Sequence, residues 1–378
     1  MGGLITFWLA ADKTLKEVIA VDEKTKTIAS SEPKKVLSRG IVTVTDRYVT
    51  EARASLPEAA RAYAYMTSLY ADGLLRQLEP KDQLVAAQLL LKALYPQFDT
   101  EAGVAALAAE YVISPQPPQA AVKPEVSALV ETYTKRMALD RHDQAWDGTI
   151  PTGSGKWVAD AQQTPATPKA GDWKRWVISG APVLPAPPVA GSEALAQEID
   201  DVKIAVAKAD ESAINMLHGW LGNDALKTPA GVWQKTLYEQ VAKELSDDDV
   251  EADKQYANLQ KNLAITIADA AMESWRVAYV YWTARPSMLD ASISPALDNP
   301  AYPAYPSALS TISSAAAQVL AVQVPAHKGE WFELAERLRD AQVQAGIQLP
   351  ADNKAGYDLG ELVGQQIVSQ QKLSALLQ

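Results

Sequence analysis

Apolar residues recur at three- and four-residue spacing from Asp46 onward, and this helical periodicity constrains the fold more than any other feature. Residues 52–78 place Ala, Tyr, Met and Leu at this spacing, which predicts a long and largely buried helix. Residues 246–249 predict the N-terminal cap of a second long helix, which runs to about Ala284. Further helices are predicted over 81–95, 99–113, 121–140, 193–207, 208–221, 230–245, 307–323, 328–346 and 353–376. The sequence therefore predicts an all-α protein.

Two segments depart from this periodicity. Residues 13–45 carry short β-branched bursts around turn-like residues, which favours a hairpin or an irregular arm. Residues 147–192 are rich in Pro, Gly and Thr, which is typical of a linker or of a loop packed on the surface. Packing is favoured because large apolar rings are costly to leave in water. The rings concerned are Trp157, Trp173 and Trp176. We predict an N-terminal arm, 1–45, and one helical domain, 46–378, that contains this irregular loop.

The balance of residue types narrows the class of protein. Of 378 residues, 48% are hydrophobic and 21% are charged, which is typical of a globular protein with a sizeable core. The net charge of -11 argues against nucleic acid or an anionic membrane as the partner, because both favour Lys and Arg. Cys is absent, which excludes disulfides, thiolate zinc sites and Cys nucleophiles. No apolar run reaches the roughly 18 residues of a membrane span.

The start of the chain, Gly2 to Ala11, is apolar and ends in small residues, as the tail of a signal peptide does. No Lys or Arg precedes the apolar stretch, so a complete secretory signal is not predicted. Two interpretations stay open, a trimmed export signal and an ordinary buried N-terminal segment. We expect a soluble protein, and its compartment stays open.

Three motif-like patterns lack the residues that their chemistry needs. Residues 152–156 resemble a phosphate-binding loop, but Ile150 replaces the first Gly and Trp157 replaces the Ser or Thr that binds magnesium. The acidic run 247–253 lacks the central Gly and the ligand spacing of a calcium loop, which favours a solvated first helical turn. The histidines are widely separated, so no metal site is expected from them. They are His142, His218 and His327.

Several ordered segments resemble one family, and no single one of them is specific. They are Ala268 to Ala271 with Trp275, Tyr279 and Tyr281; Arg285-Pro286; Pro303 to Ser307; Ala345 to Gln348; and Asp352-Asn353 with Gly356 and Gly360. In this order and spacing they resemble bacterial vanadium-dependent haloperoxidases and the related type-2 phosphatidic acid phosphatases. The turn Thr228 to Trp233 and the stretch Gly155 to Trp157 extend the resemblance, which covers roughly residues 40 to 372.

The resemblance implies a helical bundle that binds vanadate or a phosphoryl group as an anion. The family's pattern is Lys-x6-Arg-Pro, then Pro-Ser-Gly-His, then Ser-Arg-x5-His-x3-Asp. The cations neutralise the anion's oxygens, one His ligates vanadium or attacks phosphorus, and the other His acts as acid or base. Dimerisation by helix packing is a further expectation from the resemblance.

Most of the family's charged and titratable side chains are replaced in this chain. Arg285, Ser307 and Asp352 are retained. The replacements are Ala278 for the Lys, Ala308 and Leu309 for the Gly and the acid–base His, Ala341 and Gln342 for the Ser-Arg pair, and Gln348 for the ligating His. Losing a Lys and an Arg alone weakens oxyanion binding by about 3–6 kcal/mol, because each charged hydrogen bond contributes about 1.5–3 kcal/mol. No catalytic residue and no cofactor are expected.

Two functional interpretations follow. The first is a catalytically silent, haloperoxidase-like pseudoenzyme that binds a protein or a glycan through aromatic residues on the Pro-rich loops 147–192 and 299–306, although these rings could equally cover the bundle. The second is a divergent enzyme that holds phosphate or vanadate through Arg285 and Ser307. Its pocket would also contain Gln342, Gln348 and Asp352.

The packing of Arg285 leaves further alternatives open. In a silent protein, Arg285, Ser307 and Asp352 satisfy each other or backbone carbonyl groups, with Asp290 or Asp352 as the companion of the buried guanidinium. A register shift of one helical turn would instead bring Arg337 or Arg339 into the pocket.

Overall fold

The computed structural model describes residues 36–114, 121–159, 164–180, 182–221, 228–246 and 248–377, which belong to one compact unit. Within these ranges the regular elements are helices, and this confirms the predicted all-α class. Residues 1–35 of the predicted arm, including Gly2 to Ala11, lie outside the described residues.

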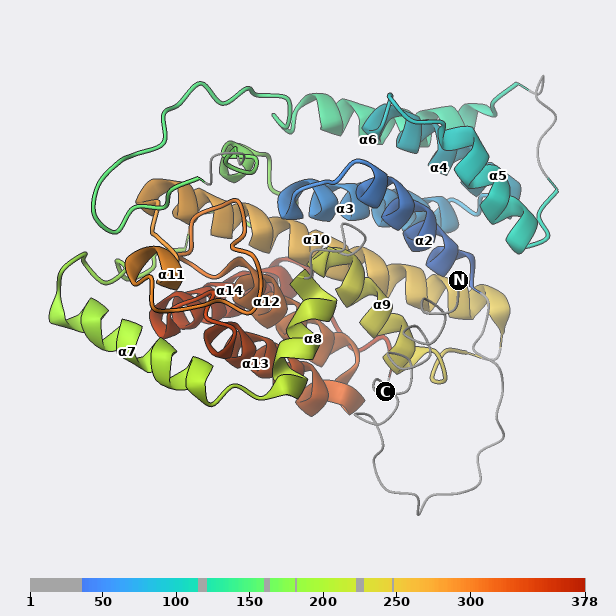
Figure 1. Ribbon diagram of the computed structural model, residues 1–378. Helices are drawn as coiled ribbons and strands as arrows, with labels where there is room; N and C mark the ends of the chain where they lie inside the picture. Colours follow the sequence, from blue (N-terminus) through green and yellow to red (C-terminus); the bar gives the residue numbers. More distant parts are fainter. Residues whose placement is uncertain are drawn as a thin grey trace, which may run out of the picture. The chain divides into compact units, whose positions relative to one another are not determined.

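The helices follow the predicted order along the chain (Figure 1). They are α2 (Leu37–Glu51), α3 (Leu56–Leu75), α4 (Pro80–Leu94), α5 (Thr100–Glu110), α6 (Pro124–Ala138), α7 (Glu193–Ala207), α8 (Glu211–Leu221), α9 (Pro229–Val241), α10 (Asp249–Tyr281), α11 (Pro286–Leu289), α12 (Ala308–Gln323), α13 (Lys328–Gln344) and α14 (Pro350–Gln371). Two short 3-10 turns, η1 (Ala170–Asp172) and η2 (Pro325–His327), complete the set.

The central element is α10, which contacts α3 on one side and α12 on the other (Figure 1). Asp248 caps its N-terminus by accepting a hydrogen bond from the Glu251 N–H at 2.9 Å, so the acidic run begins a helix as predicted. The helix ends where Trp282 adopts the left-handed backbone conformation, with φ 54°. Lys156, the lysine of the phosphate-loop-like stretch, donates from Nζ to the Tyr281 carbonyl at 2.7 Å. This stretch therefore caps a helix.

Helices α12, α13 and α14 form the C-terminal group, in which α14 lies unusually close to α12. Gly356 and Gly360 face the backbone carbonyl groups of Ser307 and Thr311, and a Cβ at either Gly would overlap those atoms. Only Gly permits this approach. The contact places the start of α14 against the start of α12, where the candidate site lies.

The beginning of the helical unit differs from its prediction. Residues 37–45, which were predicted in the arm, form most of α2, and the predicted helix 52–78 begins only at Leu56. β-Branched residues at 41–45 suggested extended structure, yet Ile41 and Val44 are buried in the main core, and this packing outweighs local propensity. A capping box of Ser55 and Glu58 starts α3.

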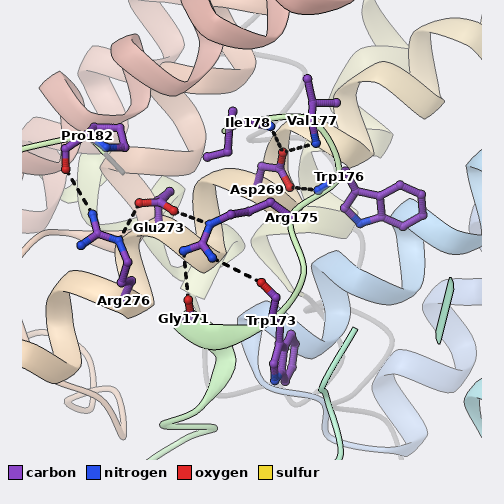
Figure 2. A network of polar contacts seen from close by, with 10 residues as sticks. All are labelled: Gly171, Trp173, Arg175, Trp176, Val177, Ile178, Pro182, Asp269, Glu273 and Arg276. Carbon is purple, nitrogen blue, oxygen red and sulfur yellow. Dashed lines mark hydrogen bonds and ion pairs between the residues drawn. The ribbon is translucent and has the colours of Figure 1, made fainter. Parts of the chain in front are cut away.

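The loop 147–192 packs against α10 through two buried carboxylates (Figure 2). The Asp269 carboxylate accepts hydrogen bonds from three successive backbone N–H groups, those of Trp176, Val177 and Ile178, at 2.6, 2.8 and 3.0 Å. Glu273 pairs with Arg175, whose guanidinium also donates to the Gly171 and Trp173 carbonyls. The described part of the segment is therefore a packed loop, as its Trp residues predicted.

Candidate functional site

The polar residues at the positions that the resemblance identifies lie on five parts of the fold. Arg285 precedes α11, Ser307 is the N-cap of α12, Gln342 belongs to α13, Gln348 lies in the α13–α14 turn and Asp352 is in the first turn of α14. Each of these five side chains is at most 2% exposed. Their polar atoms form two hydrogen-bonded clusters, here called the Arg285 cluster and the Ser307 cluster.

The Arg285 cluster surrounds a fully buried guanidinium. Arg285 donates from Nη1 to the Ile347 carbonyl at 3.0 Å and from Nη2 to the Tyr302 carbonyl at 3.1 Å. In the amide orientation that satisfies both ends, Gln348 accepts from Arg285 Nη1 at 2.9 Å and donates to Asp352 Oδ2 at 3.0 Å. Gln348 therefore links the cation to the carboxylate.

The Ser307 cluster is built from neutral side chains. Ser307 Oγ donates to Gln342 Oε1 at 2.9 Å, and Gln342 Nε2 donates to Ser310 Oγ at 3.0 Å. Ser310 Oγ in turn donates to Asn353 Oδ1 at 3.0 Å, and the Asn353 amide donates to the Arg339 carbonyl at 2.7 Å. The sequence analysis did not predict that Ser310 belongs to this cluster. Its position three residues after the N-cap Ser307 would have indicated that the two side chains lie close together.

Burial governs the electrostatics of the Arg285 cluster. It raises the pKa of Asp352 to about 7, against the opposing effects of the Leu349 N–H donor and the Arg285 charge. Burial also lowers the pKa of Arg285. Burial therefore disfavours the charged form of Asp352 and the charged form of Arg285. This is expected for a buried carboxylate and a buried cation that are joined through the neutral Gln348 amide.

The remaining family positions add no polar side chain to the two clusters. Ala278 on α10, Leu309 on α12 and Ala341 on α13 are buried. Ala308, which begins α12, is buried beside Leu309. The structure therefore brings the polar positions together in two clusters and buries the apolar side chains that stand where the resemblance implies Lys and His.

Two of the alternatives for Arg285 are wrong. Asp290 pairs with Lys203 at 2.7 Å and is not the companion of the guanidinium. Arg339 pairs with Asp340 at 2.8 Å and lies over the Tyr357 ring. Arg337 is exposed on α13, so neither α13 arginine occupies the site and a shift of one helical turn does not apply.

The three histidines lie apart from this site and from each other. His142 Nδ1 is 3.3 Å from Asp140 Oδ1, His327 contacts Glu244 and Glu330, and His218 is exposed on α8. In the described ranges, no group of three or more His, Asp or Glu side chains is arranged to hold a metal ion.

The aromatic rings of the two Pro-rich loops point inward rather than forming exposed contact surfaces. Trp157, Trp173 and Tyr305 are at most 2% exposed, and the Tyr305 hydroxyl donates to the Pro185 carbonyl, which joins the two loops. Trp176 and Tyr302 are half-buried against the main core. The expectation of an exposed surface was wrong for the three buried rings, which instead cover the bundle.

A cavity of about 360 Å³ lies beside the Arg285 cluster. Its lining includes Tyr302 and Ile347, whose carbonyl oxygens bind Arg285, together with residues at the starts of α3 and α9. No helix in the described ranges is long and apolar enough to cross a membrane.

Comparison with solved structures identifies the fold. The chain is similar to a bacterial vanadium-dependent iodoperoxidase, with 17% identity, a TM-score of 0.70, and coverage of 90% of this chain and 98% of that one. It is also similar to the holo and apo forms of a bacterial vanadium-dependent chloroperoxidase, each at 10% identity. The holo form has a TM-score of 0.63, and the match covers 95% of this chain and 97% of that one. The apo form has a TM-score of 0.61, and the match covers 91% of this chain and 95% of that one. The bundle thus has the vanadium haloperoxidase fold, as the resemblance implied.

Searches with family sequence models and among curated proteins found no match.

Proposed function

We propose that this protein uses a haloperoxidase-type bundle as a non-catalytic scaffold, and that it performs neither vanadate-dependent halide oxidation nor phosphoryl transfer by the family's mechanism. One observation carries the proposal. Arg285, the retained cation, is fully buried, and its guanidinium donates to two backbone carbonyl groups and to the Gln348 amide. An incoming oxyanion would have to displace these acceptors.

The residues at these positions do not fit vanadate. Its oxygens need cationic donors, but Ala278 has none and the Gln342 amide already bonds to Ser307 and Ser310. The ligating imidazole is replaced by Gln348, whose amide nitrogen has no available lone pair and donates to Asp352. The acid–base position is Leu309, which cannot titrate.

The free energy of the missing hydrogen bonds supports the same conclusion. Each hydrogen bond to a charged group contributes about 1.5–3 kcal/mol, so the two missing cations lower oxyanion affinity by roughly two to four decades. Displacing the acceptors of a buried guanidinium adds a further cost, because a buried polar group left without a partner is itself destabilising.

One observation favours a second candidate, a divergent enzyme that binds an oxyanion through Arg285. The Nε of Arg285 is buried and has no partner within the described residues, and the cavity of about 360 Å³ is formed by neighbours of this side chain. An anion entering that cavity would be attracted to the guanidinium. This candidate predicts phosphate or vanadate binding that depends on Arg285.

The two candidates are separated by titrating the full chain with vanadate and with phosphate in a calorimeter. We expect no saturable binding up to about 10 mM, in line with the lost decades of affinity. Saturable binding that Arg285→Lys weakens tenfold, while Lys203→Met leaves it unchanged, would establish the divergent enzyme instead. Iodide or bromide oxidation that requires vanadate, or phosphatase turnover abolished by Gln348→Ala, would overturn the proposal altogether.

A further inference from the structure

A second cavity, of about 290 Å³, lies between the last turns of α10 and the loop 147–192. None of the residues in the Arg285 and Ser307 clusters lines it. Its lining is unusually rich in aromatic rings, with Trp146, Trp275, Tyr279 and Trp282. Large aromatic rings at a surface cavity are typical of ligand recognition, because they supply apolar contact area without much loss of conformational entropy.

The walls of this cavity are fixed in place by buried contacts. Gly171 of η1 lies directly on α10, where a Cβ would overlap the backbone of Arg276. The Trp275 indole and the Tyr279 hydroxyl both donate to the Ala166 carbonyl, at 3.0 and 2.6 Å. Figure 2 shows the carboxylate contacts that hold the same loop segment on α10. The cavity is therefore preformed, which lowers the entropic cost of binding a ligand.

The accessible aromatic surface of the cavity belongs to Trp146 and Tyr279, whereas Trp275 and Trp282 are buried. Tyr279 and Trp282 have centroids 4.8 Å apart and are almost perpendicular, and Trp146 lies 6.0 Å from Trp282 at an interplanar angle of 33°. At these separations the rings contact each other and leave no space for a cation between them. A ligand must therefore stack on the accessible faces of the half-buried Trp146 and Tyr279, here called the platform.

The charges around the platform favour a neutral ligand. Arg276 is engaged by Glu273 at 2.8 Å and by the Pro182 carbonyl at 3.1 Å, so its guanidinium is not available to an anion (Figure 2). Lys169 Nζ is 3.7 Å from Asp172 Oδ2, which places a donor and an acceptor of opposite charge side by side at the rim. The protein as a whole carries -11, which further disfavours anions.

We propose that this cavity binds a neutral carbohydrate. The C–H face of a pyranose ring matches the accessible apolar faces of Trp146 and Tyr279. Its hydroxyl groups both donate and accept hydrogen bonds, which matches a rim formed by Lys169, Asp172 and Thr149. The cavity volume is close to the lower end of the range for small-molecule sites and suits one or two sugar rings.

The test is calorimetric titration of the full chain with five neutral oligosaccharides, namely maltohexaose, cellohexaose, xylohexaose, mannohexaose and chitohexaose. We expect at least one to bind with a Kd of about 1 mM or tighter, with no change in affinity between low and high salt. Saturation-transfer NMR should show the strongest transfer to ring C–H protons of the sugar. Trp146→Ala should weaken binding about tenfold, which corresponds to about 1.4 kcal/mol, because it removes a ring on which the sugar stacks.

A second variant keeps the test decisive if Trp146→Ala perturbs folding. Gly148→Ala retains the indole but displaces it, because a Cβ at this position would overlap the Trp146 ring, and it should also weaken binding. Tyr357→Ala, a half-buried aromatic residue on α14 outside the cavity, is the matched control and should bind as the unchanged protein does. Failure of all five sugars to bind, binding that Trp146→Ala does not weaken, or binding lost in Tyr357→Ala to the same extent would overturn the proposal.

This outcome is independent of the vanadate and phosphate titrations. Weaker sugar binding in Trp146→Ala tests the sugar site, whereas weaker oxyanion binding in Arg285→Lys tests the oxyanion site. Each proposal therefore fails by its own measurement.

Discussion

Gln348 explains how a buried cation and a buried carboxylate are held side by side in this bundle. Its amide accepts from Arg285 and donates to Asp352, so both charged groups keep a hydrogen-bond partner. An apolar residue at position 348 would remove one of two hydrogen bonds at Arg285 Nη1, which also donates to the Ile347 carbonyl, and one of two at Asp352 Oδ2, which also accepts from the Leu349 N–H. Each lost hydrogen bond to a charged group costs about 1.5–3 kcal/mol. The Gln348 amide thus bridges Arg285 and Asp352 but has no titratable nitrogen, unlike an imidazole.

At the residue scale, Asp352 predicts a pH-dependent stability. Its pKa is raised to about 7 in the folded protein and is about 3.9 when unfolded, so its stabilising protonation is complete below pH 4 and is lost as the pH rises through 7. The free energy of unfolding should therefore fall as the pH rises from 5 to 8. We expect Asp352→Asn to reduce this fall by about 2–4 kcal/mol. Urea unfolding at a series of pH values measures it.

The matched control is Asp358→Asn, an exposed carboxyl one and a half turns later in α14 that pairs with Lys354. Its pH profile should follow that of the unchanged protein within about 0.5 kcal/mol. Parallel profiles for Asp352→Asn and Asp358→Asn would contradict the assignment of the slope to Asp352.

At the scale of elements, helix boundaries were predictable wherever a cap or a helix breaker is local. The predicted α7 matches its observed bounds, and Ser192, its N-cap, accepts a hydrogen bond from the Leu195 N–H. The prediction failed at α2, where β-branched residues are helical because their side chains fill the space between neighbouring helices. Besides the following helix α3, this helix contacts α9 and α10, which are distant along the chain, so a local pattern could not reveal it.

The anchoring of the loop 147–192 was not predictable, although Asp269 was part of the resemblance. A buried Asp in an otherwise apolar helix is a recognisable signal, but its partners are the backbone N–H groups of residues about 90 positions earlier, as the separations of 91 to 93 residues show. Every residue except Pro has a backbone N–H group, so the sequence does not show which of these groups bind a carboxylate. This is why the loop could be predicted to pack but its contacts could not be identified.

Asp269→Asn is expected to destabilise the protein by about 2–4 kcal/mol, because both carboxylate oxygens accept hydrogen bonds and the amide nitrogen of Asn would face N–H donors. The change should also make residues 164–180 more susceptible to limited proteolysis. Thermal unfolding and mass spectrometry of the fragments measure the two effects. Asp172→Asn, an exposed carboxyl of the same loop, should change stability by less than about 0.5 kcal/mol. Equal effects of the two variants would refute the anchoring role.

At the scale of the whole molecule, the positions of the candidate site were predictable and its contacts were not. The order and spacing of short motifs located Arg285, Ser307, Gln342, Gln348 and Asp352, and the ends of α11 to α14 place these residues in two hydrogen-bonded clusters. The companions of Arg285 depend on carbonyl groups in two separate turns, those of Tyr302 and Ile347, which carry no sequence signal. The alternatives with Asp290 and Arg339 arose for this reason.

The scaffold predicts what happens when the family's side chains are restored. The combined variant Ala278→Lys, Leu309→His, Gln342→Arg and Gln348→His places new cations at buried positions, so its Tm should be lower than that of the unchanged protein. Vanadate should raise the Tm of this variant, since a ligand that binds the folded state stabilises it.

Val280→Lys is the control, because it adds a cation to an exposed position on the same helix as Ala278. Its Tm should respond to vanadate no more than that of the unchanged protein. If vanadate leaves the Tm of the combined variant unchanged as well, the four positions do not converge on an anion in this bundle.

The contact between Asp269 and the loop bears on how relatives of this chain can be recognised. Three main-chain amides bind the carboxylate, so these hydrogen bonds place no requirement on the side chains of residues 176–178, of which Trp176 and Ile178 also pack in the main core. Solved structures of this fold share only 10% to 17% of their residues with the chain. Sequence identity alone therefore does not report this attachment, in which the one side chain is the Asp269 carboxylate near the middle of α10.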